Sequence, residues 1–136
     1  MGFMITLIEI LAIFVSIIIL DFLWLGVITK KFIIKQFGSL VKVEDGSLKI
    51  NLFVGVFAWF VIALGCYIFA VAPSDTLVNA ARMGAIFGFI SYAIYDLTNL
   101  TFINTYPVRF AIVDIVWGTI LCSSISFIGF FAGSMM

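Results

Sequence analysis

Four long runs of apolar residues make up most of the chain, and three short polar intervals separate them. A hydrocarbon core about 30 Å thick needs roughly 20 apolar residues in a helix, and each run is long enough. The runs do not alternate apolar and polar residues as the strands of a membrane barrel do, so helices remain to satisfy the backbone in lipid. The pattern predicts an all-α membrane protein, with spans over residues 4–29, 52–72, 77–103 and 108–131 in a single four-helix transmembrane domain, 1–136.

The polar intervals contain residues that are typical of turns and helix caps. Residues 44–46, Glu-Asp-Gly, predict a turn before the second span. Ser47 or Asn51 is the expected N-cap of the second span, and Ser74 or Asp75 that of the third.

Composition excludes several classes of protein. Hydrophobic residues make up 65% of the chain and charged residues 10%, against about 25% charged in an ordinary soluble domain. A domain of this size cannot bury so much apolar surface. These values exclude a soluble monomer, a disordered chain and a nucleic-acid binder, and predict the lipid bilayer as the partner. The chain has no histidine, which rules out His-ligated haem, His-ligated metals and a Ser-His-Asp triad.

Basic residues predict the orientation of the spans. The first and third intervals hold all but one of them: Lys30, Lys31, Lys35, Lys42, Lys49 and Arg109. The opposite side has only Arg82. By the positive-inside rule, the first and third loops are cytoplasmic and both termini lie on the outer side.

The first loop is also a candidate amphipathic segment. Its apolar residues recur at near-helical spacing from Phe32 to Val41, and its lysines fall on the other face. One interpretation is a short basic amphipathic segment on the cytoplasmic leaflet. The alternative is a cytoplasmic extension of the first span that only supports orientation.

Carboxylates within the spans are candidate functional residues because charge inside a membrane is costly. Asp21, Asp96 and Asp114 each fall roughly 9–13 Å below the cytoplasmic boundary at about 1.5 Å per residue. Three helices are therefore expected to bring a carboxylate to one layer. Glu9 lies near the outer end of the first span, where Arg82 is its expected partner.

Polar and aromatic residues accompany the three aspartates in the sequence. Trp24 and Trp117 follow Asp21 and Asp114 by three residues, and each carries a ring N–H that can donate. The other candidates for a binding pocket belong to the third span: Tyr92, Tyr95, Thr98 and Asn99. The spacing places Tyr92 and Asn99 on one helical face with Asp96.

No basic residue within the spans neutralises this layer, so either some aspartates are protonated or a bound cation or donor-rich substrate fills the site. The first hypothesis is an acidic pocket, open to the cytoplasm, that binds or transports a cation or an amine-bearing small molecule with proton coupling. A four-span carrier is expected to be a homodimer. The second is a membrane enzyme or accessory subunit in lipid or fatty-acid modification, with the three aspartates as ligands of any metal ion. The third is a structural subunit in which the aspartates join helices.

Small and aromatic residues predict how the helices pack. Gly84 and Gly88, and Gly129 and Gly133, have the spacing that allows close helix approach. The two cysteines, Cys66 and Cys122, are expected to be free buried thiols. The second span has no charge, and its aromatic residues predict a lipid-facing helix: Phe53, Phe57, Trp59 and Phe60.

Nearly the whole chain resembles the DUF2177 family of small predicted bacterial membrane proteins. The resemblance rests on three segments: 20–26 (LDFLWLG), 92–99 (YAIYDLTN) and 113–119 (VDIVWGT). It implies a four-span, multi-pass protein of the bacterial inner (cytoplasmic) membrane and no established activity. In such a membrane the outer side, where the basic residues predict both termini, is the periplasmic side.

Overall fold

The computed structural model describes residues 2–136 and contains four long helices. The first combines α1 (Gly2–Leu23) with the π-helix Trp24–Ile28, and the second combines α3 (Leu52–Cys66) with the π-helix Tyr67–Val71. The third and fourth are α4 (Leu77–Phe102) and α5 (Val108–Ser134). All four are long and apolar enough to cross a membrane, which confirms the four predicted spans.

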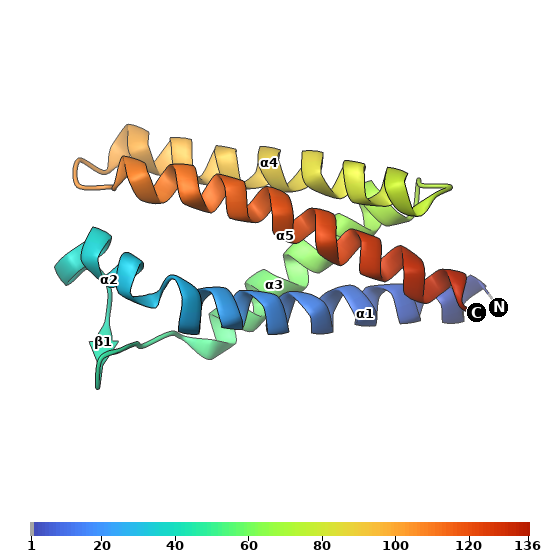
Figure 1. The fold of residues 1–136 in the computed structure, drawn as a ribbon, viewed down its shortest axis with the longest axis horizontal. Helices are drawn as coiled ribbons and strands as arrows, with labels where there is room; N and C mark the ends of the chain where they lie inside the picture. The colour runs from blue at the N-terminus through green and yellow to red at the C-terminus, as the bar shows by residue number, and fades with distance from the viewer. Residues whose placement is uncertain (1) are drawn as a thin grey trace.

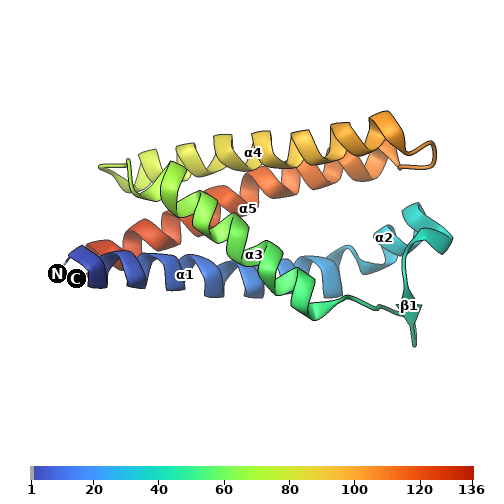
Figure 2. The same ribbon diagram turned by 180° about the vertical axis from the view of Figure 1, so that it is seen from behind.

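The four helices form a bundle in which both termini lie at the same end (Figure 1). Helices α4 and α5 run side by side in opposite directions, and α1 lies along α5 on its other side. Helix α3 crosses α1 obliquely, as the reverse view shows (Figure 2). The first loop and the α4–α5 loop therefore lie together at the end opposite the termini.

Helices α4 and α5 make the most extensive interface of the bundle. A Cβ atom added to Gly84 would overlap the carbonyl oxygen of Cys122, and one on Gly88 would overlap that of Gly118. A Cβ on Gly118 would overlap the ring of Tyr92. Positions four residues apart on α4 thus contact positions four residues apart on α5. Small residues at such positions let membrane helices approach closely.

The second glycine pair brings α5 against α1. A Cβ on Gly129 would overlap the side chain of Ile13, and one on Gly133 would overlap that of Glu9. Both predicted glycine pairs therefore pack within the bundle. The adjoining core contains residues of α1, α3, α5 and the second π-helix: Ile13, Ile17, Trp59, Ala63, Cys66, Val71, Leu121, Cys122 and Ile125. The two cysteines are free and buried, as expected.

The helix caps agree with the sequence at one span and differ at another. The Asn51 side chain accepts a hydrogen bond from the Val54 amide at 3.3 Å, so Asn51 caps α3 as predicted. The expected cap of α4 was wrong: Thr76 accepts from the Asn79 amide at 3.1 Å. Ser74 instead donates to the carbonyl oxygen of Ala70 at 2.6 Å.

The first loop folds into α2 (Lys30–Phe37), the 3₁₀ turn Gly38–Leu40 and a hairpin of β1 (Val43–Glu44) and β2 (Ser47–Leu48). The predicted turn is confirmed, since Asp45 and Gly46 join the strands with positive φ angles of 50° and 73°. The Phe37 ring packs edge-on against two other rings, with 4.7 Å between its centroid and that of Phe110 and 5.6 Å to that of Tyr106. The apolar side of α2 thus contacts the end of the bundle itself.

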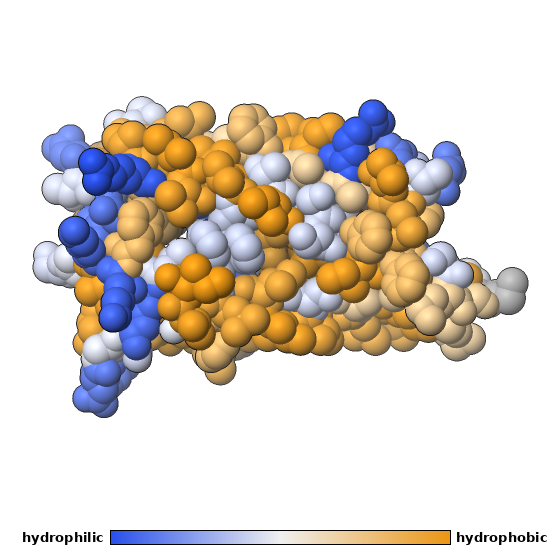
Figure 3. Space-filling view, in the orientation of Figure 1, coloured by the Kyte–Doolittle hydropathy of each residue, from blue (hydrophilic) through white to orange (hydrophobic). Residues whose placement is uncertain are grey.

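The surface of the bundle has the polarity expected of a membrane protein (Figure 3). Apolar side chains cover its middle, and hydrophilic residues gather toward its two ends. Three of the four aromatic residues expected to face lipid are exposed, namely Phe53, Phe57 and Phe60. The fourth expectation was wrong, because Trp59 is 6% exposed and belongs to the core.

The glycine contacts predict a strong effect of one methyl group. We expect Gly88→Ala to lower the free energy of unfolding by about 1–3 kcal/mol, because the new Cβ meets backbone that can yield only if the helices separate. Gly55→Ala is the matched control, since a Cβ there meets nothing within 4 Å. Thermal unfolding in detergent measures both, and equal stabilities would contradict the proposed close packing.

Candidate functional site

Asp21 is the point at which three helices are connected by hydrogen bonds. Its side chain leaves α1 toward the bundle and is 8% exposed. The indole Nε1 of Trp59, on α3, donates to Oδ2 at 2.7 Å, and that of Trp117, on α5, donates to Oδ1 at 2.9 Å. Both oxygens of this carboxyl group therefore accept an indole N–H, and each bond joins α1 to another helix.

Trp24 and Trp117 are both beside Asp21, but only one of them donates to it. Their rings stack with centroids 4.2 Å apart and planes 4° from parallel. Trp117 donates to Asp21 on another helix, although it lies one turn from Asp114 on its own. The stack adds an apolar contact between α5 and the π-helix that extends α1.

Asp96 has an environment different from that of Asp21. It is completely buried, and the hydroxyl of Tyr106 donates to its Oδ1 at 2.6 Å. Its Oδ2 is buried without a hydrogen-bond partner among the described residues. The half-buried Asp114 lies beside it, close enough for the two carboxyl groups to interact directly.

The antiparallel packing of α4 and α5 explains why Asp96 and Asp114 are neighbours. Gly84, Gly88 and Tyr92 are spaced four residues apart on α4 and contact α5 in turn. Asp96 is the next residue in that series and faces Asp114 across the same interface. The two aspartates lie equally far from the loop, at about 9 Å along each helix.

Tyr106 is in the α4–α5 loop and closes the pair from the loop side. Burial, followed by the hydrogen bond to Asp96, raises the pKa of the Tyr106 hydroxyl above its ordinary value. The hydroxyl therefore keeps its proton and remains a donor at neutral pH. Asn99, one turn beyond Asp96 on α4, lies next to this hydroxyl.

The predicted site residues separate into groups in the structure. Trp24 and Trp117 are beside Asp21, while Asn99 and Asp114 are near Asp96. Tyr92 is half-buried between the helices, with its ring against Gly118. Tyr95 and Thr98 do not join the site, because both are exposed on the outer face of α4.

The three aspartates do not form one cluster of ligands. Among residues 2–136, no group of three or more His, Cys, Asp or Glu side chains is arranged to hold a metal ion. The layer predicted from helix depth thus consists of a hydrogen-bonded carboxylate, Asp21, and a carboxyl pair, Asp96 and Asp114.

The expected contact between Glu9 and Arg82 was wrong. Arg82 donates to the side chain of Asn79 at 3.0 Å, and Glu9 packs against Gly133. The ion pair found in the described part of the chain joins Lys49 and Glu44 in the first loop.

Sequence reasoning missed two donors, Trp59 and Tyr106. A buried indole N–H usually has a hydrogen-bond acceptor. The sequence does not show that Trp59 is buried, so it gave no reason to look for its acceptor. Tyr106 lies ten residues after Asp96. The sequence does not show that the loop folds back over the end of α4 and brings Tyr106 to Asp96.

Four apolar helices around buried carboxyl groups define a multi-pass integral membrane protein of the lipid bilayer. The family model described as predicted membrane protein (DUF2177) matches residues 6–131, so the chain belongs to the DUF2177 family. No curated protein and no solved structure matches the chain.

The Asp21 contacts predict a measurable coupling between α1 and α3. Trp59→Phe and Asp21→Asn, combined in a double-mutant cycle, are expected to show a coupling of about 1 kcal/mol or more in the free energy of unfolding. Phe57→Leu is the control, because this side chain is 63% exposed, and its coupling to Asp21→Asn is expected to stay below about 0.5 kcal/mol. Equal couplings would contradict a specific indole–carboxylate bond.

Tyr106 has a matched control on the neighbouring helix. We expect Tyr106→Phe to cost about 1–3 kcal/mol of unfolding free energy, because it removes the donor to a buried carboxyl oxygen. Tyr95→Phe removes a hydroxyl from a side chain that is 61% exposed and is expected to change stability by less than about 0.5 kcal/mol. Chemical unfolding in detergent compares the two, and a neutral Tyr106→Phe would contradict the importance of this bond.

Proposed function

We propose that this protein binds and transports a cation or an amine-bearing small molecule across the bacterial inner membrane in exchange for protons, at the Asp96–Asp114 pair. The observation that carries the proposal is the environment of Asp96. This carboxyl group is completely buried, its Oδ2 has no partner among the described residues, and a second carboxyl group lies beside it.

Electrostatics explains why such a pair favours exchange. Two adjacent carboxylates in a medium of low dielectric repel each other strongly. One shared proton relieves the repulsion and supplies a donor for Oδ2. A cation or an ammonium group supplies the same compensation, so proton and cation compete for one place.

Asp21 supports the pair without taking part in the exchange. Its two oxygens already accept indole N–H groups from Trp59 and Trp117, so both are satisfied by the chain itself. Asp21 is within electrostatic range of Asp114 and adds to the acidic surroundings of the pair.

The basic residues support an orientation with the pair near the cytoplasm. All the lysines, and Arg109, lie in or beside the two loops at the end opposite the termini. The positive-inside rule then places this end in the cytoplasm and both termini in the periplasm. Asp96 and Asp114 lie about 9 Å from their helix ends, a short path from the cytoplasm.

Thermal unfolding in detergent, across pH and a panel of alkali, divalent and organic ammonium cations, tests the proposal. A ligand at 100 times its dissociation constant adds about 2.7 kcal/mol to the folded state. We expect one class of cation to stabilise the wild-type protein at high pH. The effect is expected to fade as pH falls, because protons then occupy the pair.

Asp96→Asn is expected to abolish this stabilisation while the bundle stays folded, because the amide can donate to Asp114 in place of the shared proton. Asp75→Asn is the matched control, since Asp75 is exposed near the other end of the bundle. Flux of the stabilising cation into liposomes, with a pH dye inside, then measures exchange. Flat curves for wild type and Asp96→Asn would contradict the proposal, and unfolding of Asp96→Asn would support a purely structural role.

A further inference from the structure

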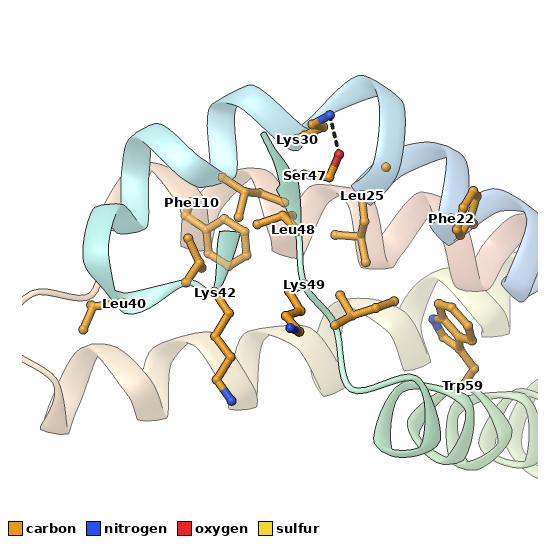
Figure 4. A pocket seen from close by; sticks show the side chains of 14 residues that line it. Phe22, Leu25, Lys30, Leu40, Lys42, Ser47, Leu48, Lys49, Trp59 and Phe110 are labelled. Carbon is orange, nitrogen blue, oxygen red and sulfur yellow. Dashed lines mark hydrogen bonds between the residues drawn. The ribbon is translucent and has the colours of Figure 1, made fainter. Parts of the chain in front are cut away.

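A cavity of about 600 Å³ lies beside the bundle where the first loop folds back on it (Figure 4). Its walls come from the end of α1 and the π-helix, α2, the loop hairpin, the middle of α3 at Trp59, and the first turn of α5 at Phe110. The volume is within the range of roughly 300–1,000 Å³ typical of small-molecule sites.

The lining of the cavity is divided between apolar walls and basic residues. Phe22, Leu25 and Phe110 are among the apolar lining residues, and Phe22 and Leu25 belong to the first membrane-spanning helix. The charged lining residues are Lys30, Lys42 and Lys49. No acidic residue of the described chain lines it.

Most of this positive charge lacks an internal partner. Lys49 pairs with Glu44 at 2.7 Å. Lys30 donates to the neutral hydroxyl of Ser47 at 2.9 Å, which leaves its charge uncompensated. Lys42 is exposed and has no ion pair among the described residues. The cavity therefore presents two free positive charges beside an apolar chamber.

We propose that this cavity binds an anionic phospholipid of the surrounding leaflet, with its phosphate at Lys30, an acyl chain against the apolar walls, and the exposed Lys42 adding positive charge at the edge of the cavity. The position supports this occupant, because the cavity lies where the apolar surface of the bundle meets its hydrophilic end (Figure 3), and that end holds the lysines. Basic pockets beside membrane helices attract anionic headgroups, and an acyl chain can enter from the bilayer side without crossing water.

Trp59 provides a probe inside the cavity. Its ring forms part of the lining, near Phe22 in Figure 4, while its Nε1 donates to Asp21. A brominated acyl chain in the cavity would contact this indole and quench its fluorescence. The site is independent of the Asp96–Asp114 pair, so its test does not depend on transport.

The experiment titrates purified protein in an uncharged detergent with brominated phosphatidylglycerol or brominated phosphatidylcholine and follows tryptophan fluorescence. We expect saturable quenching at about a tenfold lower fraction of phosphatidylglycerol than of phosphatidylcholine. Trp59→Phe is expected to remove the saturable component. Lys30→Gln with Lys42→Gln is expected to abolish most of the headgroup preference.

The control removes the same number of charges from the same loop. Lys31→Gln with Lys35→Gln leaves the cavity lining intact and is expected to keep the preference. If the Lys30→Gln, Lys42→Gln double variant disturbs the hairpin, Lys42→Gln alone replaces it in the titration. Circular dichroism verifies that each variant is folded. Equal affinity for both lipids, or an equal loss of headgroup preference in both double variants, would overturn the proposal. So would displacement of phosphatidylglycerol by a lower concentration of laurate, a fatty acid without a phosphate.

Discussion

A carboxylate inside a membrane has no water to solvate it, so the chain itself must provide its donors. Asp21 shows how this constraint organises the bundle. Its two oxygens are satisfied by indoles from α3 and α5, and one buried carboxyl group thereby connects three helices. The oblique path of α3 across α1 (Figure 2) brings Trp59 to this point. Apolar surfaces alone provide little such direction in lipid, because hydrocarbon is as good a partner as leucine.

The same constraint is met only in part at Asp96. One oxygen accepts a hydrogen bond from the hydroxyl of Tyr106, while the other is buried beside Asp114 and has no donor among residues 2–136. A carboxyl group with both oxygens hydrogen-bonded has a structural role. A carboxyl group with an unpartnered oxygen beside a second acid can still accept a proton or a cation. The bundle therefore combines a fully hydrogen-bonded carboxyl group, Asp21, with a neighbouring carboxyl pair, Asp96 and Asp114, that has an unpartnered oxygen among the described residues. Close glycine packing between α4 and α5 holds that second site in place.

The sequence predicted those features that depend on length and spacing along one helix. Four spans, both glycine pairs, the Asn51 cap and the shared depth of Asp96 and Asp114 all follow from such local rules. It did not predict the burial of Trp59 or the outward direction of Tyr95, because both depend on helix rotation about its axis. Helices that are apolar on every side encode that rotation weakly. Tyr106 was missed because its contact requires knowing the path of a loop.

The π-helix Trp24–Ile28 has a consequence for how the chain tolerates insertion and deletion. Its widened turn, closed by the bond from the Thr29 amide to the Trp24 carbonyl at 2.8 Å, accommodates one residue more than an α-helical turn. Buried residues recur every four positions on both sides of it, at Ile17, Asp21, Thr29 and Ile33. A regular helix would drift away from that period. Deleting one residue there would restore the α-helix and bring Thr29 to seven residues after Asp21, close to two whole turns, so Thr29 and Ile33 would keep facing the protein.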